Sequence, residues 1–208
     1  DKPAFGVGSL EDYFAAYEAA GGEKVDRDRF HFWLVYRTLW WALGCLDMGQ
    51  AWRSGADRTV ERVVVGRRTA EQELDLLMLL EQAAPEAERA RPLPASASAA
   101  AAPIGEPSQR EMIEAVRDWI EAEIKPKAQG HEKFQAVVAM NALGILMRDV
   151  EAGVRAEDKA LAEAILRGER DLSEAGLLAH LRRQVLDKCA VDSGKYPALA
   201  KARQLWIK

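Results

Sequence analysis

The stretch FHFWLVYRTLWWALGCLDMGQAW, residues 30–52, is the most apolar part of the sequence and is central to predicting the fold. Its large apolar side chains recur at helical spacing and cover more than one face of a helix. The stretch contains His31, Arg37 and Asp47, and its unbroken apolar run covers only Leu39–Leu46, whereas a membrane-spanning helix needs about 20 largely uncharged residues. We therefore predict a long central helix packed on several sides, in a protein without a membrane partner.

The composition of the whole chain points the same way. Among its 208 residues, Ala and Leu together outnumber Val, Ile and Thr more than twofold, which favours helix over sheet. The formal net charge of −4 argues against a general polyanion binder, so no nucleic-acid partner is expected. Only two cysteines occur, Cys45 and Cys189, which excludes a disulfide framework and makes a reducing cytoplasm the expected location.

Helix start and stop signals divide the remaining sequence into segments. Ser108 and Glu111 form a full capping box, and apolar residues follow at helical spacing until Lys125-Pro126 ends the helix. The other expected helices are one short helix between Ser9 and Gly21, one at about 58–81 with Ala70, Leu74, Leu77 and Leu80 on its core side, and further helices at about 132–152, 156–167, 173–191 and after Pro197.

The composition changes abruptly at residues 83–107. Ten of these 25 residues are Ala and five are Pro, and no apolar period runs through them, as is typical of a linker. We therefore predict an all-α protein with two helical bundles, residues 1–82 and 108–208, joined by an Ala/Pro-rich linker at 83–107.

Motifs for catalysis, metal binding or cofactor binding are weak throughout. The three histidines, His31, His131 and His180, are isolated from one another and lack the spacing of metal ligands. The glycine-rich segment at residues 5–9 lacks a third glycine, a Gly-Lys-Ser/Thr sequence and a preceding strand, so it does not predict a phosphate loop. Cys45 lies among apolar residues and is expected to be buried and inert.

A cluster of aromatic residues raises two possibilities. Trp33, Trp40 and Trp41 belong to one predicted helix, and Arg37 lies one turn from both Trp33 and Trp41. Core packing is the more common role of aromatic residues at helical spacing, with Arg37 stacked on an indole or paired with an acid. The alternative is that these four residues form one wall of a pocket for an acceptor substrate.

Asn141 lies within the apolar run 136–147. Because its neighbours leave the helix apolar nearly all round, we expect the amide to be buried. A buried amide needs partners, so a structural hydrogen bond to a neighbouring helix or a water molecule is expected.

Several sequence motifs in the first 82 residues resemble one known family. The run Phe5-Gly6-x-Gly8-Ser9-Leu10-Glu11-Asp12, then Tyr17-Glu18-Ala19-Ala20-Gly21, Phe32-Trp33 and Gly66-Arg67-Arg68-x-Ala70-Glu71-x-Glu73-x-Asp75-Leu76-Leu77, resembles the carboxyl-terminal helical region of aminoglycoside-phosphotransferase-like kinases. The similarity covers about residues 3–82. It implies the helical end of a small-molecule kinase domain, where helices help to shape the acceptor site.

The second half is similar to an uncharacterised bacterial helical domain that accompanies such kinases. The pieces that carry this similarity are Glu114-Ala115-Val116 with Glu121, Ala139-x-Asn141-Ala142-Leu143, and the positions Leu178, His180, Leu181 and Val185-Leu186-Asp187-Lys188. The similarity implies an interaction or regulatory role without naming a reaction.

Kinases of this family use a His-x-Asp catalytic loop followed by Asn, and then a metal-binding Asp. None of the three histidines here is followed two residues later by Asp. The resemblance therefore implies a carboxyl-terminal fragment that is inactive alone, with no catalytic residue and no cofactor of its own. ATP and magnesium would belong to a missing amino-terminal kinase portion, which would be its partner.

Two alternatives stay open on the sequence alone. The chain could be a stand-alone helical protein-interaction module with no kinase role, or a ligand-binding bundle whose tryptophans line the site. Assembly into a homo-oligomer is a further possibility.

Overall fold

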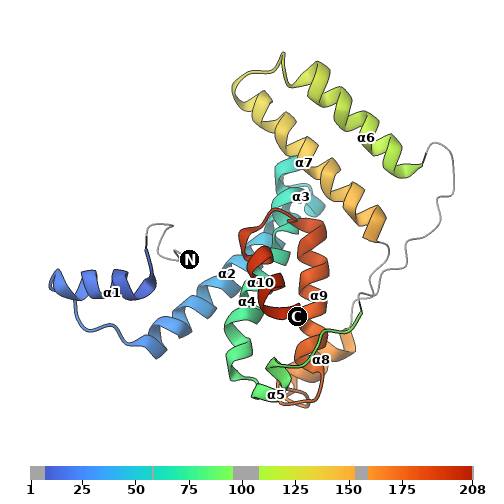
Figure 1. Ribbon diagram of the computed structural model, residues 1–208. Coiled ribbons are helices and arrows are strands. Elements are labelled where there is room, and N and C mark those ends of the chain that lie inside the picture. The colour runs from blue at the N-terminus through green and yellow to red at the C-terminus, as the bar shows by residue number, and fades with distance from the viewer. Residues whose placement is uncertain (1–7, 58, 96–107, 153–158, 208) are drawn as a thin grey trace. The chain divides into compact units, whose positions relative to one another are not determined.

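The computed structural model describes residues 8–57, 59–95, 108–152 and 159–207, and over these ranges the protein is all-α, as predicted (Figure 1). The chain divides into two compact units, residues 1–37 and 38–208, which are described separately. The α-helices are α1 Leu10–Ala19, α2 Arg27–Ser54, α3 Val60–Arg67, α4 Thr69–Leu80, α5 Glu86–Arg89, α6 Gln109–Trp119, α7 Gly130–Ala152, α8 Lys159–Leu166, α9 Leu177–Asp192 and α10 Pro197–Trp206; a 3-10 turn, η1 Glu81–Ala83, follows α4, and a π-helix, η2 Ile120–Ile124, extends α6.

The first unit contains α1 and the beginning of α2, packed around one aromatic side chain. Phe14 is buried and meets the Phe30 ring edge-on, with the ring centroids 4.8 Å apart. The Arg27 guanidinium lies 4.0 Å from the centre of the Phe14 ring and also pairs with Glu11. The Ser9 side chain accepts a hydrogen bond from the Asp12 backbone N–H, which caps α1 as its sequence predicts.

In the second unit, the rest of α2 buries only one side. Ala42 and Cys45 are fully enclosed, and Gly49 crosses Gly66 of α3 so closely that a Cβ atom added at Gly66 would lie 3.2 Å from the Gly49 Cα atom. Our prediction that this helix is packed on several sides is therefore wrong for this part of α2. Its neighbours contact the small-residue side and leave the side with Leu39, Leu43 and Leu46 exposed.

The helix predicted at about 58–81 is two helices, α3 and α4, with the break at Arg68. The Thr69 hydroxyl donates to the Gly66 carbonyl oxygen (2.9 Å), and such local side-chain bonds compete with the regular helical pattern. Of the four residues expected on its core side, Ala70, Leu74 and Leu77 are buried, whereas Leu80 is exposed.

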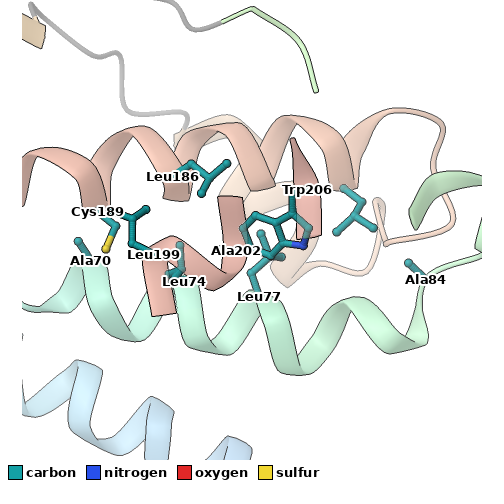
Figure 2. Packing of buried hydrophobic residues seen from close by; sticks show 10 residues of the cluster. Ala70, Leu74, Leu77, Ala84, Leu186, Cys189, Leu199, Ala202 and Trp206 are labelled. Carbon is teal, nitrogen blue, oxygen red and sulfur yellow. The ribbon is translucent and has the colours of Figure 1, made fainter. Parts of the chain in front are cut away.

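One hydrophobic core contains residues from two segments that lie far apart in the sequence, 70–84 and 178–206 (Figure 2). Helix α4 contributes Ala70, Leu74 and Leu77, and it packs against both α9 and α10. The partners from those helices are apolar side chains with at most 5% of their surface exposed: Leu178, Leu186, Cys189, Leu199, Ala202 and Trp206. Residues more than 100 positions apart therefore share the best-packed part of the protein.

This shared core corrects the predicted arrangement of two bundles, residues 1–82 and 108–208. Helix α4 cannot belong to a separate amino-terminal bundle, because its buried side is covered by α9 and α10. The boundary between compact units falls instead between Arg37 and Thr38, inside α2. Sequence composition indicated where regular apolar periodicity stops, but it could not show which helices fill each other's cores.

Part of the predicted linker also belongs to the fold. Residues 84–95 contain α5, and Leu93 packs against the core. The Arg182 and Arg183 side chains donate to the carbonyl oxygens of Arg89 (2.7 Å) and Pro94 (2.9 Å), which fixes this segment along α9. The remaining linker residues, 96–107, lie outside the described residues.

Cleavage of the chain between residues 96 and 107 tests the shared core. We expect the two pieces to stay together after a specific protease site placed there is cut, because α4 leaves its apolar side exposed if α9 and α10 depart. Size-exclusion chromatography should then give both pieces in one peak, at the elution volume of the uncut chain at the same concentration, until denaturant is added. Two independently folded pieces that separate in native buffer would contradict the shared core.

Candidate functional site

The exposed apolar side of α2 is the most distinctive surface of the second unit. This side carries four large apolar residues at helical spacing: Leu39, Trp40, Leu43 and Leu46. Each has about half of its surface exposed, with Leu43 at 53%. We call these four residues the α2 face. Single exposed apolar residues are common, whereas a contiguous exposed apolar row is typical of interaction surfaces.

The tryptophans predicted to line an acceptor pocket are distributed over both units. Trp33 and Arg37 are exposed residues of the first unit, where the Trp33 ring meets those of Phe32 and Tyr36 edge-on at 5.5 Å. Trp40 is exposed in the second unit, and Trp41 beside it is partly buried. Core packing therefore does not account for Trp33 and Trp40, since about half of each indole is open to solvent.

Asn141 is exposed, so our prediction that it is buried is wrong. Helix α7 contacts α3, α6 and α9, but these neighbours leave the side that carries Phe134, Val137 and Asn141 uncovered. The apolar residues around Asn141 in the sequence therefore do not all face a core. An amide that is open to water needs no partner from a neighbouring helix.

Helix α4 and the turn η1 after it bond to α9 and to the residues between α9 and α10 through a series of acidic side chains. The Ser193 hydroxyl donates to Glu71 (2.8 Å), and the Tyr196 hydroxyl donates to Asp75 (2.6 Å). Lys188 forms an ion pair with Glu73. The buried Arg182 forms another with the buried Glu81, with 2.7 Å between the guanidinium nitrogen and the carboxylate oxygen. Sequence reasoning missed this seam, although three acids within α4 and Glu81 directly after it were a signal for polar partners elsewhere in the chain.

Burial perturbs several groups along this seam. Desolvation raises the pKa of Asp75, and the hydrogen bond from Tyr196 offsets only part of that increase. Burial likewise raises the pKa of the Cys189 thiol to about 12 and that of Cys45 above its ordinary value. Both thiols are thus protonated at neutral pH, which is the opposite of what a nucleophilic cysteine requires.

Two shallow grooves lie along the pair of helices α6 and α7. One has a volume of about 470 Å³ and is lined by residues that include Trp119, Ile120, Ile124 and Ala139; the other, of about 300 Å³, is lined by Gln109, Met112, Ile113, Val116 and Leu143. The linings are almost entirely apolar, so they offer few groups that could orient a polar substrate. Among the described residues, no three His, Cys, Asp or Glu side chains are grouped so that they could hold a metal ion.

No helix in the described ranges combines the length and the apolar character that crossing a bilayer requires.

Substitution of Asp75 by Asn tests the buried seam. Because the pKa of Asp75 is raised in the folded state, its contribution to stability is present below the unfolded pKa and is lost as pH rises through the folded pKa. At pH 7 the neutral amide of the variant avoids the cost of desolvating a carboxylate, and its oxygen still accepts the hydrogen bond from the Tyr196 hydroxyl. Asp75→Asn should therefore raise the thermal midpoint. It should also remove the pH dependence of stability that Asp75 causes. Tyr196→Phe is the control and should lower stability by about 1 kcal/mol. A lower midpoint for Asp75→Asn at pH 7 would refute this account of the seam.

Comparison with known proteins identifies one segment. Residues 126–196, about a third of the chain, match the family described as "Domain of unknown function (DUF6285)". This segment contains α7, α8 and α9 and lies within the second half of the chain. No curated protein and no solved structure matches the chain.

Proposed function

We propose that the chain is the carboxyl-terminal helical part of an aminoglycoside-phosphotransferase-like small-molecule kinase. In this proposal the α2 face packs against the catalytic portion of the kinase, which binds ATP and magnesium. The chain itself transfers no phosphate. The sequence motifs of residues 3–82 suggest the family, and the exposed α2 face is the observation that carries the docking role.

The chemistry of the α2 face restricts what can cover it. Four uncharged apolar side chains, each about half exposed, gain most from an equally apolar surface that removes them from water. Their neighbours provide no cluster of Lys or Arg of the kind that binds phosphate backbones or anionic headgroups. A protein surface is therefore the partner that this chemistry favours, and the catalytic portion of the kinase is the proposed one.

Trp33, Arg37, Trp40 and Trp41 have a specific place in this proposal. In the assembled kinase Trp40 and Trp41 of the second unit contribute to the wall of the acceptor pocket, and Trp33 and Arg37 of the first unit are sequence-based candidates for the same role. Indole rings offer flat apolar surfaces, while the Arg37 guanidinium offers donors to an oxygen-rich acceptor. Their substitution by Ala should then affect acceptor binding by the assembled kinase and leave nucleotide binding unchanged.

The chain alone should show no magnesium-dependent ATP binding. The His-x-Asp loop that positions the acceptor hydroxyl is absent from the sequence, as are the glycine-rich nucleotide loop and its lysine. Calorimetric titration with ATP and magnesium measures this directly and should give only heats of dilution. A dissociation constant in the micromolar range would contradict the proposal that ATP and magnesium bind only to the catalytic portion.

Docking through the α2 face should depend on Leu43. The partner for the test is the amino-terminal catalytic portion of the proposed kinase, mixed with the chain at known concentrations. Leu43→Glu places a charge in the interface and should weaken binding by at least tenfold, as measured by calorimetry. The matched control is Leu205→Glu on α10, since Leu205 is 50% exposed and lies outside the α2 face.

The two variants separate the possible outcomes of this experiment. Both should keep the helical content and thermal midpoint of the parent chain, because both side chains already face solvent. Equal binding by the Leu43→Glu variant and the parent chain would exclude the α2 face as the docking surface. No binding by the parent chain would contradict the kinase role and favour a stand-alone interaction module.

A further inference from the structure

Helices α6 and α7 form an antiparallel hairpin that resembles half of a four-helix bundle (Figure 1). The Ser108–Glu111 capping box starts α6, and Arg110 pairs with Glu151 near the open end of the hairpin. Unlike α4 or α9, α6 contains no buried residue. Its apolar residues are regularly spaced, yet the part of the chain that the structure describes leaves them largely uncovered.

One side of this hairpin carries two parallel apolar rows. Met112, Val116 and Trp119 of α6 recur at intervals of four and three residues, and Leu143, Leu146 and Val150 of α7 recur at intervals of three and four. We call these six residues the hairpin face. The smaller groove, lined by Met112, Val116 and Leu143, runs between the two rows and shows that they border one surface. All six except the partly buried Leu143 are exposed, Trp119 to 56%.

We propose that a second copy of the chain covers the hairpin face, so that the two hairpins form a four-helix bundle. A hairpin with one apolar side is half of such a bundle, and a second copy supplies the same length and the same two rows. Twofold symmetry requires a patch to be complementary to itself, and uncharged apolar rows meet this condition because they place no like charges opposite each other.

The size of the face agrees with a weak dimer. The exposed half of a tryptophan side chain offers roughly 100 Å², since aromatic side chains bury about 150–250 Å² each. The other five side chains bring the hairpin face to roughly 500 Å² per copy, or roughly 1,000 Å² in a dimer, which is near the lower limit for a specific interface. We therefore expect reversible association with a dissociation constant on the order of 10 µM.

The charges around the face argue against other occupants. The charges next to the α6 row are of both signs, since the acidic Glu111, Glu114 and Asp118 alternate with Arg110 and Arg117. They form no basic cluster of the kind that binds a nucleic acid or an anionic bilayer. The inference is independent of the proposed kinase role, because it depends on α6 and α7 alone. The α2 face lies on a different helix and stays available to another partner.

Sedimentation equilibrium of the whole chain from about 2 to 500 µM tests the proposal. The parent chain should rise from its monomer mass of 23.0 kDa towards twice that value. Val116→Glu places a charge inside the hairpin face and should weaken association at least thirtyfold. Val137→Glu is the matched control: Val116 is 48% and Val137 47% exposed, and helical spacing places Val137 on the side of α7 opposite Leu146.

Each outcome of this experiment decides the proposal. A monomeric parent chain at every concentration would overturn it, and so would a dimer that Val137→Glu disrupts and Val116→Glu does not. Leu43→Glu tests the α2 face in the same assay and should leave the dimer intact; loss of the dimer in that variant would assign self-association to the α2 face instead. Circular dichroism melts of all three variants show whether the fold is retained, and Val116→Ala replaces Val116→Glu if the latter unfolds.

Discussion

The packing of α4 against α9 and α10 is the constraint on which the rest of the second unit depends. Leu74 and Leu178 are completely buried in this contact, and at its far end the Arg182 guanidinium meets Glu81 where both are shielded from water. A buried ion pair stabilises little by itself, but the loss of one partner leaves an uncompensated charge that costs about 3–5 kcal/mol. The pair therefore fixes how α4 lies along α9, and the apolar residues supply most of the stability.

The other surfaces follow from this contact. One residue, Arg68, separates α3 from α4. Gly66 of α3 lies close to Gly49 of α2, so this part of α2 buries only the side that carries small residues. Arg148 of α7 donates to the Val191 carbonyl oxygen of α9 (2.7 Å), which positions the hairpin next to the same core. The hairpin face thus lies on a pair of helices that contacts α9 through α7, and such support favours binding because little order is lost.

The sequence predicted the local features of the fold and missed its long-range contacts. The Ser108 capping box and the Ser9 cap form as expected, since each depends on residues three positions apart. Leu74 was correctly placed in a core, but its partners lie more than 100 residues away and no local pattern identifies them. Asn141 shows the same limit: apolar neighbours predict a buried helix, but only the contacts of α7 determine which side is covered. The α2 face had a visible signal in its helical spacing, which we attributed to a core.

Because α4 and α9 share one core, they should unfold as one cooperative unit, and native-state hydrogen exchange of the parent chain and of Leu74→Ala measures this. Removal of the buried Leu74 side chain should cost about 2–5 kcal/mol. We expect the slowest-exchanging amides of residues 69–80 and 177–192 to share one free energy of opening and to lose the same amount of it in the variant. Faster exchange confined to residues 69–80, with 177–192 unchanged, would contradict the account, because the two segments would then belong to separate cores.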